Sequence, residues 1–138
     1  MAQDFTVVGA EKLRTAFAVI GNTVVIEDGD VVEAASGLVV KGTATGAKLA
    51  YAPFAHASGG GTQIEITVGN EFVLAGTGDA VYAVADKGTA ADLVVNTGAQ
   101  QIDVSASSTN VFIVCMAQPT AVVGVATNIH VVIALPLF

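Results

Sequence analysis

The sequence is poor in several residue types, and each shortage narrows the class of protein. It contains one cysteine, Cys115, and no tryptophan. A single thiol excludes an intramolecular disulfide, and the apolar residues on both sides of Cys115 predict a small buried side chain. The N-terminus lacks a basic region followed by an apolar stretch. We therefore expect synthesis in a reducing cytoplasm, without a secretion signal.

Basic residues are also scarce, which bears on the choice of partner. Five Lys and Arg residues stand against twelve Asp and Glu residues, and the formal net charge is −7. Only Lys12 and Arg14 lie close together in the sequence. Nucleic-acid binding needs several bases on one face to neutralise phosphates. Nucleic acid is therefore not an expected partner.

Long apolar runs are missing although 53% of the residues are hydrophobic. The uninterrupted runs are a few residues long, and Val111–Ala117 is an example. A membrane-spanning helix needs about 20 consecutive apolar residues. We expect neither a spanning helix nor a membrane partner.

Charge is absent from the last quarter of the chain. Val104–Phe138 contains no Asp, Glu, Lys or Arg, and it ends in an apolar tail. A soluble monomer normally spreads charges over its surface, so this segment must be buried in its own core or against other copies. We expect a homotrimer in which Ala121–Phe138 contributes to the inter-subunit core, with these residues at the interface: Ile133, Leu135, Leu137 and Phe138.

What is present is a series of short β-branched runs separated by Gly, Asn, Asp and Ser, a pattern typical of all-β proteins. It predicts a compact β-sandwich or barrel-like domain with antiparallel hairpins. The candidate strands are Phe5–Val8, Phe17–Ile20, Thr23–Glu27, Val31–Ala34, Leu38–Lys41, Lys48–Ala52, Gln63–Val68, Glu71–Ala75, Ala80–Ala85, Leu93–Asn96, Gln101–Ser105, Val111–Met116, Ala121–Val125 and Ile129–Leu135.

The sequence makes more specific predictions for two turns and one strand. Asp28-Gly29 is expected to form a two-residue type I′ hairpin turn, and Gly69-Asn70 a type II′ turn. Val111–Met116 is apolar at every position, which predicts a strand covered on both faces.

No residue pattern indicates catalysis or a metal site. The acidic stretch from Glu27 to Glu33 lacks the ligand spacing of an EF-hand loop, and a solvated hairpin turn explains it better than a calcium site. His56 and His130 have no second His or Cys at metal-ligand spacing, and no Gly-x-Ser-x-Gly motif exists. We expect no catalytic, cofactor-binding or metal-binding residues, and no enzyme.

The order of turns and strands resembles the capsid cement, or decoration, proteins of tailed bacteriophages. The similar elements lie within residues 24–138: Gly29-Asp30-Val31-Val32, Gly37-Leu38-Val39-Val40, Gly59–Gly61 before Gln63–Val68, Phe72 before a Gly-rich turn, Asp86-Lys87-Gly88, Asp92-Leu93-Val94, Gln101-Ile102-Asp103, Val111-Phe112-Ile113-Val114 and a final apolar strand.

The resemblance implies a structural virion protein, made in the bacterial host cytoplasm. Such a protein binds the outside of an icosahedral capsid and clamps neighbouring major capsid subunits, often as a trimer. A tail-tube or head–tail joining protein is an alternative. A carbohydrate-binding β-module is another, although the lack of Trp counts against aromatic sugar stacking.

The N-terminal residues 1–16 are predicted to form a capsid-clasping arm before a β-domain of residues 17–138. Lys12 and Arg14 supply bases, and Phe5 and Leu13 supply apolar anchors. A segment of this kind can become ordered on a groove as it binds. The alternative is that Phe5–Val8 is an edge strand of the domain.

Overall fold

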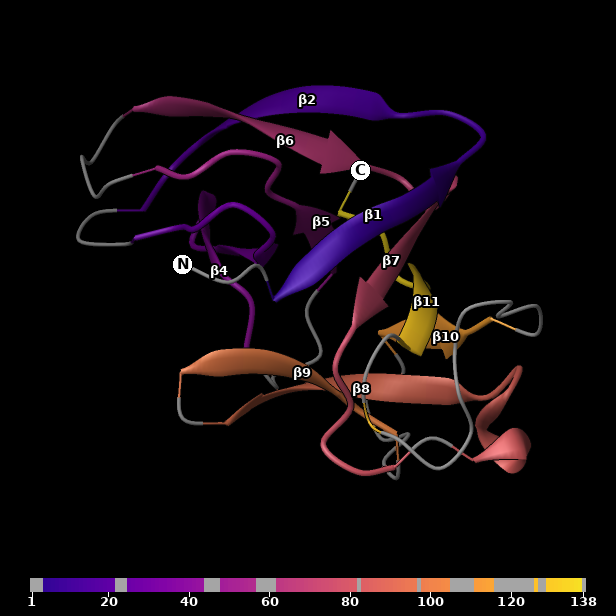
Figure 1. The fold of residues 1–138 in the computed structure, drawn as a ribbon. Coiled ribbons are helices and arrows are strands. Elements are labelled where there is room, and N and C mark those ends of the chain that lie inside the picture. Colours follow the sequence, from indigo (N-terminus) through magenta and orange to yellow (C-terminus); the bar gives the residue numbers. More distant parts are fainter. Residues whose placement is uncertain are drawn as a thin grey trace.

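Nearly all regular structure in this chain is β-strand. The computed structural model describes residues 4–21, 25–43, 48–56, 62–81, 83–96, 98–104, 111–115, 126 and 129–137. The strands form two antiparallel sheets, which confirms the all-β prediction (Figure 1). In this part of the chain the one helical element is a 3-10 turn, Val84–Asp86, which overlaps the end of the predicted strand Ala80–Ala85. No helix among these residues is long and apolar enough to cross a membrane.

The larger sheet has six strands. Their order is β1 (Phe5–Ala10), β7 (Phe72–Gly76), β11 (Ile129–Ile133), β10 (Phe112–Val114), β8 (Ala90–Asn96) and β9 (Ala99–Asp103). The β9 edge of this sheet is covered by Thr77–Asp79, the residues that follow β7. Ile102 N donates to Thr77 O at 2.8 Å, and Asp79 N donates to Ile102 O at 2.9 Å.

The smaller sheet has five strands and curls into a barrel. Their order is β2 (Arg14–Val19), β6 (Gln63–Val68), β5 (Leu49–Tyr51), β3 (Val31–Ala35) and β4 (Leu38–Lys41). Ile20 and Val39 form a parallel bridge, and Gly21 N donates to Val39 O at 2.9 Å. The first and last strands of this sheet therefore meet at one end.

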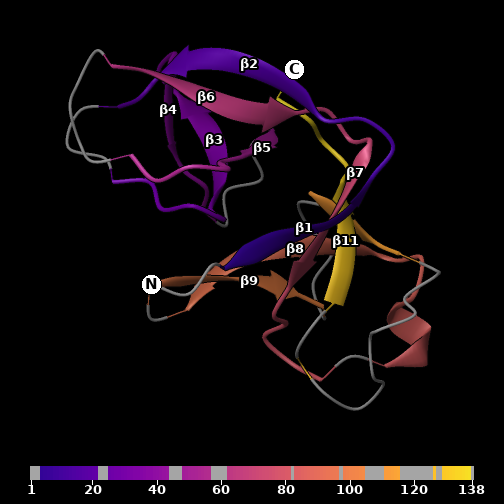
Figure 2. The same cartoon turned by 45° about the horizontal axis from the view of Figure 1, so that its top comes forward.

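Two hydrophobic cores share the middle strands. Along β3 and β5, Val31 and Leu49 face the six-stranded sheet, whereas Val32 and Ala50 face the barrel interior. Because strand side chains alternate between faces, one strand can serve both cores. Figure 2 shows the barrel above the six-stranded sheet. The structure is therefore layered, with β3 and β5 in the middle.

A bent ribbon joins the two sheets. Ala10 lies opposite Phe72 in the larger sheet, and Arg14 lies opposite Val68 in the barrel. Between them, residues 11–13 run beside residues 69–71, because the N–H groups of Glu11 and Lys12 donate to the carbonyl of Glu71 at 3.0 and 3.4 Å. The antiparallel register thus continues across the corner.

This ribbon corrects the predicted Gly69-Asn70 hairpin. The strands on its two sides, β6 and β7, belong to different sheets and do not pair with each other. Gly69 has a φ of +90°, a conformation that glycine adopts without steric cost. The sequence predicted a hairpin turn here, but Gly69 lies at the bend where the chain passes from one sheet to the other.

The predicted Asp28-Gly29 hairpin is also wrong. Ile26 bridges His56, while β3 pairs with β4 and β5. Gly29 has a φ of +88° and Asp28 is not among the positive-φ residues, whereas a type I′ turn requires positive φ at both. That combination occurs one hairpin later, between β3 and β4, where Ser36 has a φ of +52° and Gly37 one of +79°.

Two predictions about the C-terminal quarter also need correction. Ile113 of β10 is 42% exposed, so this strand is covered on one face and not on both. After β11 the chain crosses to the barrel and runs parallel to β5. Leu49 N donates to Leu135 O and Leu137 N donates to Leu49 O, each at 2.8 Å. The described part of the uncharged segment is thus packed largely within its own chain. The predicted strand Ala121–Val125 lies outside the described residues.

Candidate binding surface

The corner of the bent ribbon carries the most prominent group of exposed apolar and basic side chains near one another in the chain. We call Lys12, Leu13, Arg14 and Phe17 the corner surface. Leu13 is 55% exposed and Phe17 is 62% exposed. Exposed large apolar side chains close together on a folded surface are typical of sites that contact other molecules.

Strand alternation explains why Phe17 points outward. Ala16 and Ala18 pack against the barrel core, so Phe17 between them faces the other side of β2. Phe17 lies opposite Glu65 of β6. The backbone that carries it is fixed by pairing with β6 over the whole of β2. The corner surface therefore stands on a rigid element.

Charged side chains of both signs are exposed at the same corner. Lys12 and Arg14 are exposed, and so are Glu11 and Glu71 at the same corner. Of the remaining bases, Lys48 is exposed while Lys41 and Lys87 are half-buried. Exposed large apolar residues with charged residues nearby are common in protein–protein contacts.

Three of the four residues predicted to contact a capsid lie in the corner surface, and Phe5 does not. Phe5 is fully buried, and its ring centroid is 5.6 Å from that of Phe112. Residues 5–10 form the edge strand β1, which is the alternative that the sequence left open. The predicted boundary between residues 16 and 17 falls inside β2. Phe5 is therefore a core residue, and it is not available as an exposed anchor.

Sequence reasoning missed Phe17 as a surface residue because it did not ask which face of the chain this side chain occupies. The alternation Ala16-Phe17-Ala18 was the available signal. Strand side chains alternate between faces, so the side chain between two core-facing alanines lies on the outer face.

The residues predicted at a subunit interface differ in how deeply they are buried within the single chain. Ile133 is buried in the larger core, and Leu137 packs against the barrel core. Leu135 is 37% exposed. Phe138 lies outside the described residues. Ile133 and Leu137 therefore stabilise the chain itself.

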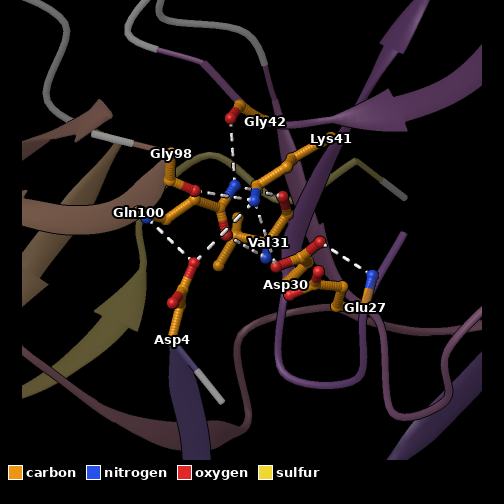
Figure 3. Close-up of polar contacts among 8 residues, drawn as sticks. All are labelled: Asp4, Glu27, Asp30, Val31, Lys41, Gly42, Gly98 and Gln100. Atoms are coloured by element: carbon orange, nitrogen blue, oxygen red, sulfur yellow. Dashed lines mark hydrogen bonds and ion pairs between the residues drawn. The ribbon is translucent and has the colours of Figure 1, made fainter. Parts of the chain in front are cut away.

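A buried polar cluster links the six-stranded sheet to the barrel, as Figure 3 shows. The side chain of Gln100 on β9 is 1% exposed and makes three hydrogen bonds to backbone groups of the barrel. Its backbone N–H donates to Asp4 Oδ2 at 2.9 Å. All hydrogen-bonding groups of the Gln100 amide are thus satisfied, as a buried amide requires.

Lys41 provides the positive charge of this cluster. Its Nζ lies 3.7 Å from Asp30 Oδ1 and 3.9 Å from Asp4 Oδ2, and it donates to Gly98 O at 3.1 Å. Asp30 is 1% exposed, and burial raises the pKa of its carboxyl group. Opposing this rise, the carboxylate accepts a hydrogen bond from Glu27 N at 2.9 Å and lies near Lys41.

The acidic stretch is therefore not the solvated hairpin turn that the sequence suggested. Glu33 is also buried, and its Oε1 accepts hydrogen bonds from Thr43 N at 2.8 Å and Thr43 Oγ1 at 2.9 Å. Buried carboxylates need such partners to offset lost hydration. The polar cluster and Glu33 act in folding, because the groups they bind are parts of the same chain.

The histidines and the cysteine do not form a reactive group among the described residues. Burial raises the pKa of the Cys115 thiol and lowers the pKa of His130. Both shifts favour the neutral forms, so the thiol is a poor nucleophile. In the part of the chain that the structure describes, no three His, Cys, Asp or Glu side chains are grouped to hold a metal ion.

Asp79 and Asp103 form a second acidic contact, at the end of the larger sheet. Burial raises the pKa of Asp79, and a hydrogen bond to Asp103 and the charge of Asp103 raise it further. Asp79 Oδ1 also accepts a hydrogen bond from Val104 N at 3.2 Å.

Comparisons with known proteins identify no relative. No family model, no curated protein and no solved structure matches this chain.

Proposed function

We propose that this chain is a structural virion protein that binds the outside of an icosahedral phage capsid and clamps neighbouring major capsid subunits. The observation that carries the proposal is the corner surface, where Leu13 and Phe17 are more than half exposed on a rigid ribbon. The resemblance to capsid cement proteins supplies the identity of the partner. No chemical step is part of this role.

The architecture supports a mechanical role. The bent ribbon belongs to both sheets, β3 and β5 belong to both cores, and Gln100 adds hydrogen bonds between the layers. We therefore expect a force applied at the corner to be transmitted to both sheets. Clamping also gains from several weak contacts acting together, which is why we propose a homotrimer.

Charge supports the outer face of the capsid as the location. A net charge of −7 per copy disfavours close approach to packaged nucleic acid. Leu135 is the one exposed residue among the described members of the predicted trimer contact, so we propose that this contact includes Leu135 and neighbouring surface.

The test is binding to expanded capsid shells assembled from the major capsid protein that is encoded with this chain. Leu13→Asp and Phe17→Asp should each lower occupancy of the shells on the order of tenfold or more, since each places a charge in an apolar contact. Val81→Asp is the matched control, because Val81 is 61% exposed and lies on the other part of the molecule, after β7. If the wild-type protein does not sediment with the shells, the proposed function is wrong.

A further inference from the structure

We infer that the free edge of β2, over Arg14–Ala18, accepts an extended segment of a partner protein as an added β-strand. β2 is the first strand of the barrel sheet, with β6 on one side. On its other side β2 approaches β4, but the bridge and the backbone hydrogen bond to that strand come after β2, at Ile20 and Gly21. Arg14–Ala18 pair with no described residue on that side.

The register of the barrel explains the open edge. In the parallel bridge Ile20 stands beside Val39, and β4 begins at Leu38, directly after the Ser36-Gly37 turn. Residues of β2 that precede Ala18 therefore extend beyond the start of β4. The overhanging part of β2 lies next to the corner of the ribbon, as the path of the indigo strands in Figure 1 shows.

β2 lacks a bulge and a proline, two features that commonly block strand addition. The edge strand β1 has a register shift between Val7 and Gly9, and β9 is covered by Thr77–Asp79. By contrast, the register of β2 with β6 is unbroken from Arg14 to Val19, and β2 contains no proline. Bulges, prolines and covering segments are the common protections of a sheet edge.

The chemistry of this edge specifies its occupant. Unpaired backbone N–H and C=O groups select an extended segment, and side chains at alternate positions give specificity. Ala16 and Ala18 are small and half-buried over the barrel core, so apolar side chains at every second position of the segment can cover them. Lys12 and Arg14 favour a carboxylate at one end of that segment.

We assign the occupant to a different protein and not to a second copy. The matching edge of a second copy is its own β2, Arg-Thr-Ala-Phe-Ala-Val, which contains no carboxylate to meet Lys12 and Arg14. The identity of the partner as the major capsid protein rests on the proposed function. The open edge itself does not depend on it.

The full chain and a synthetic strand test the inference. The probe is the peptide acetyl-Asp-Val-Thr-Val-Thr-Val-amide, added to the ¹⁵N-labelled protein. Amide hydrogen exchange at alternate residues of Arg14–Ala18 should slow on the order of tenfold or more when the peptide is added. Exchange changes confined to other strands, or protection of Arg14–Ala18 by self-association without peptide, would overturn the inference.

Two proline variants separate the backbone edge from the side chains. Strand N–H groups alternate between the two sides, so one of Thr15→Pro and Ala16→Pro removes an outward N–H and the other breaks pairing with β6. The variant that keeps the wild-type melting temperature should lose peptide protection. If that variant still protects the edge as the wild-type protein does, the inference is wrong.

The same variant distinguishes this inference from the proposed function. If it decorates capsid shells at wild-type occupancy, strand addition is wrong while capsid binding stands. If the wild-type protein binds the peptide and does not bind shells, the proposed function is wrong and the open edge stands.

Discussion

The side chain of Gln100 pairs with the backbone of Val31 as a neighbouring strand would. Its Oε1 accepts a hydrogen bond from Val31 N at 2.8 Å, and its Nε2 donates to Val31 O at 2.7 Å. The same Nε2 donates to Gly42 O at 2.9 Å. One buried amide thus connects the six-stranded sheet to the barrel.

Replacing Gln100 by leucine should strongly lower the free energy of unfolding. The N–H and carbonyl of Val31 would lose these partners in a buried site, a loss of about 3 kcal/mol. Urea unfolding followed by circular dichroism measures it. Gln101→Leu on the same strand is the control, since its Oε1 accepts a hydrogen bond from Asn96 at an exposed position. Equal losses in the two variants would contradict the linking role of Gln100.

Gly76→Ala should displace Phe5 and destabilise the fold. A Cβ at Gly76 would lie 2.6 Å from Phe5 Cε1 and 2.8 Å from Phe5 Cδ1, closer than carbon atoms pack. Overpacking of this kind costs about 1–3 kcal/mol. Gly9→Ala is the control, because a Cβ there meets nothing within 4 Å. If thermal melting shows no difference between the variants, Phe5 is not held in the core, and the arm hypothesis for residues 1–16 regains support.

Leu137→Ala should destabilise the single chain more than Leu135→Ala. Leu137 packs against the barrel core, whereas Leu135 is 37% exposed. We expect a loss of about 1–2 kcal/mol for Leu137 and less for Leu135. Thermal melting at several protein concentrations measures both. A melting temperature that depends on concentration and responds mainly to Leu135 would instead place the tail at a subunit contact.

The contact between Asp79 and Asp103 should make stability depend on pH. The folded state raises the pKa of Asp79 above 3.8, through burial first and Asp103 second. Asp103 lies opposite Asp92 of β8, so a third carboxylate is near. A raised pKa means that the folded chain binds the proton more tightly. This contribution is therefore present below the unfolded pKa and is lost as pH rises through the folded pKa.

Asp79→Asn tests this dependence. The amide oxygen can still accept the hydrogen bond from Val104 N. We expect a higher free energy of unfolding than wild type at pH 7 and a weaker decrease between pH 4 and pH 7. The raised pKa of Asp30 acts in the same direction, so some decrease should persist. Urea titrations across that range measure the difference, and identical pH profiles would contradict the prediction.

Local patterns along the sequence were sufficient to predict most of the β-strands. Short β-branched runs between turn residues predicted most of the strands, because side-chain alternation and turn conformation depend on neighbours in the chain. Lys12, Leu13 and Arg14 were identified as surface residues for the same reason. Phe17 was missed, although the small residues on both sides of it were a local signal.

The sequence did not predict which strands pair or which charged side chains are buried. Only the tertiary structure decided both. Gly69 turns a corner between sheets, and Gln100 reaches across 69 residues of sequence to Val31. Asp30, in an acidic stretch, is buried, with a hydrogen bond from Glu27 N and with Lys41 beside it. These relationships depend on which distant segments pack together, and the open edge of β2 follows from where β4 begins after a turn. By itself the sequence determined the class of fold and three of the exposed corner residues, Lys12, Leu13 and Arg14. Packing decided which strands meet, which charges are buried and which edge stays open, because each of these is a contact between segments far apart in the chain.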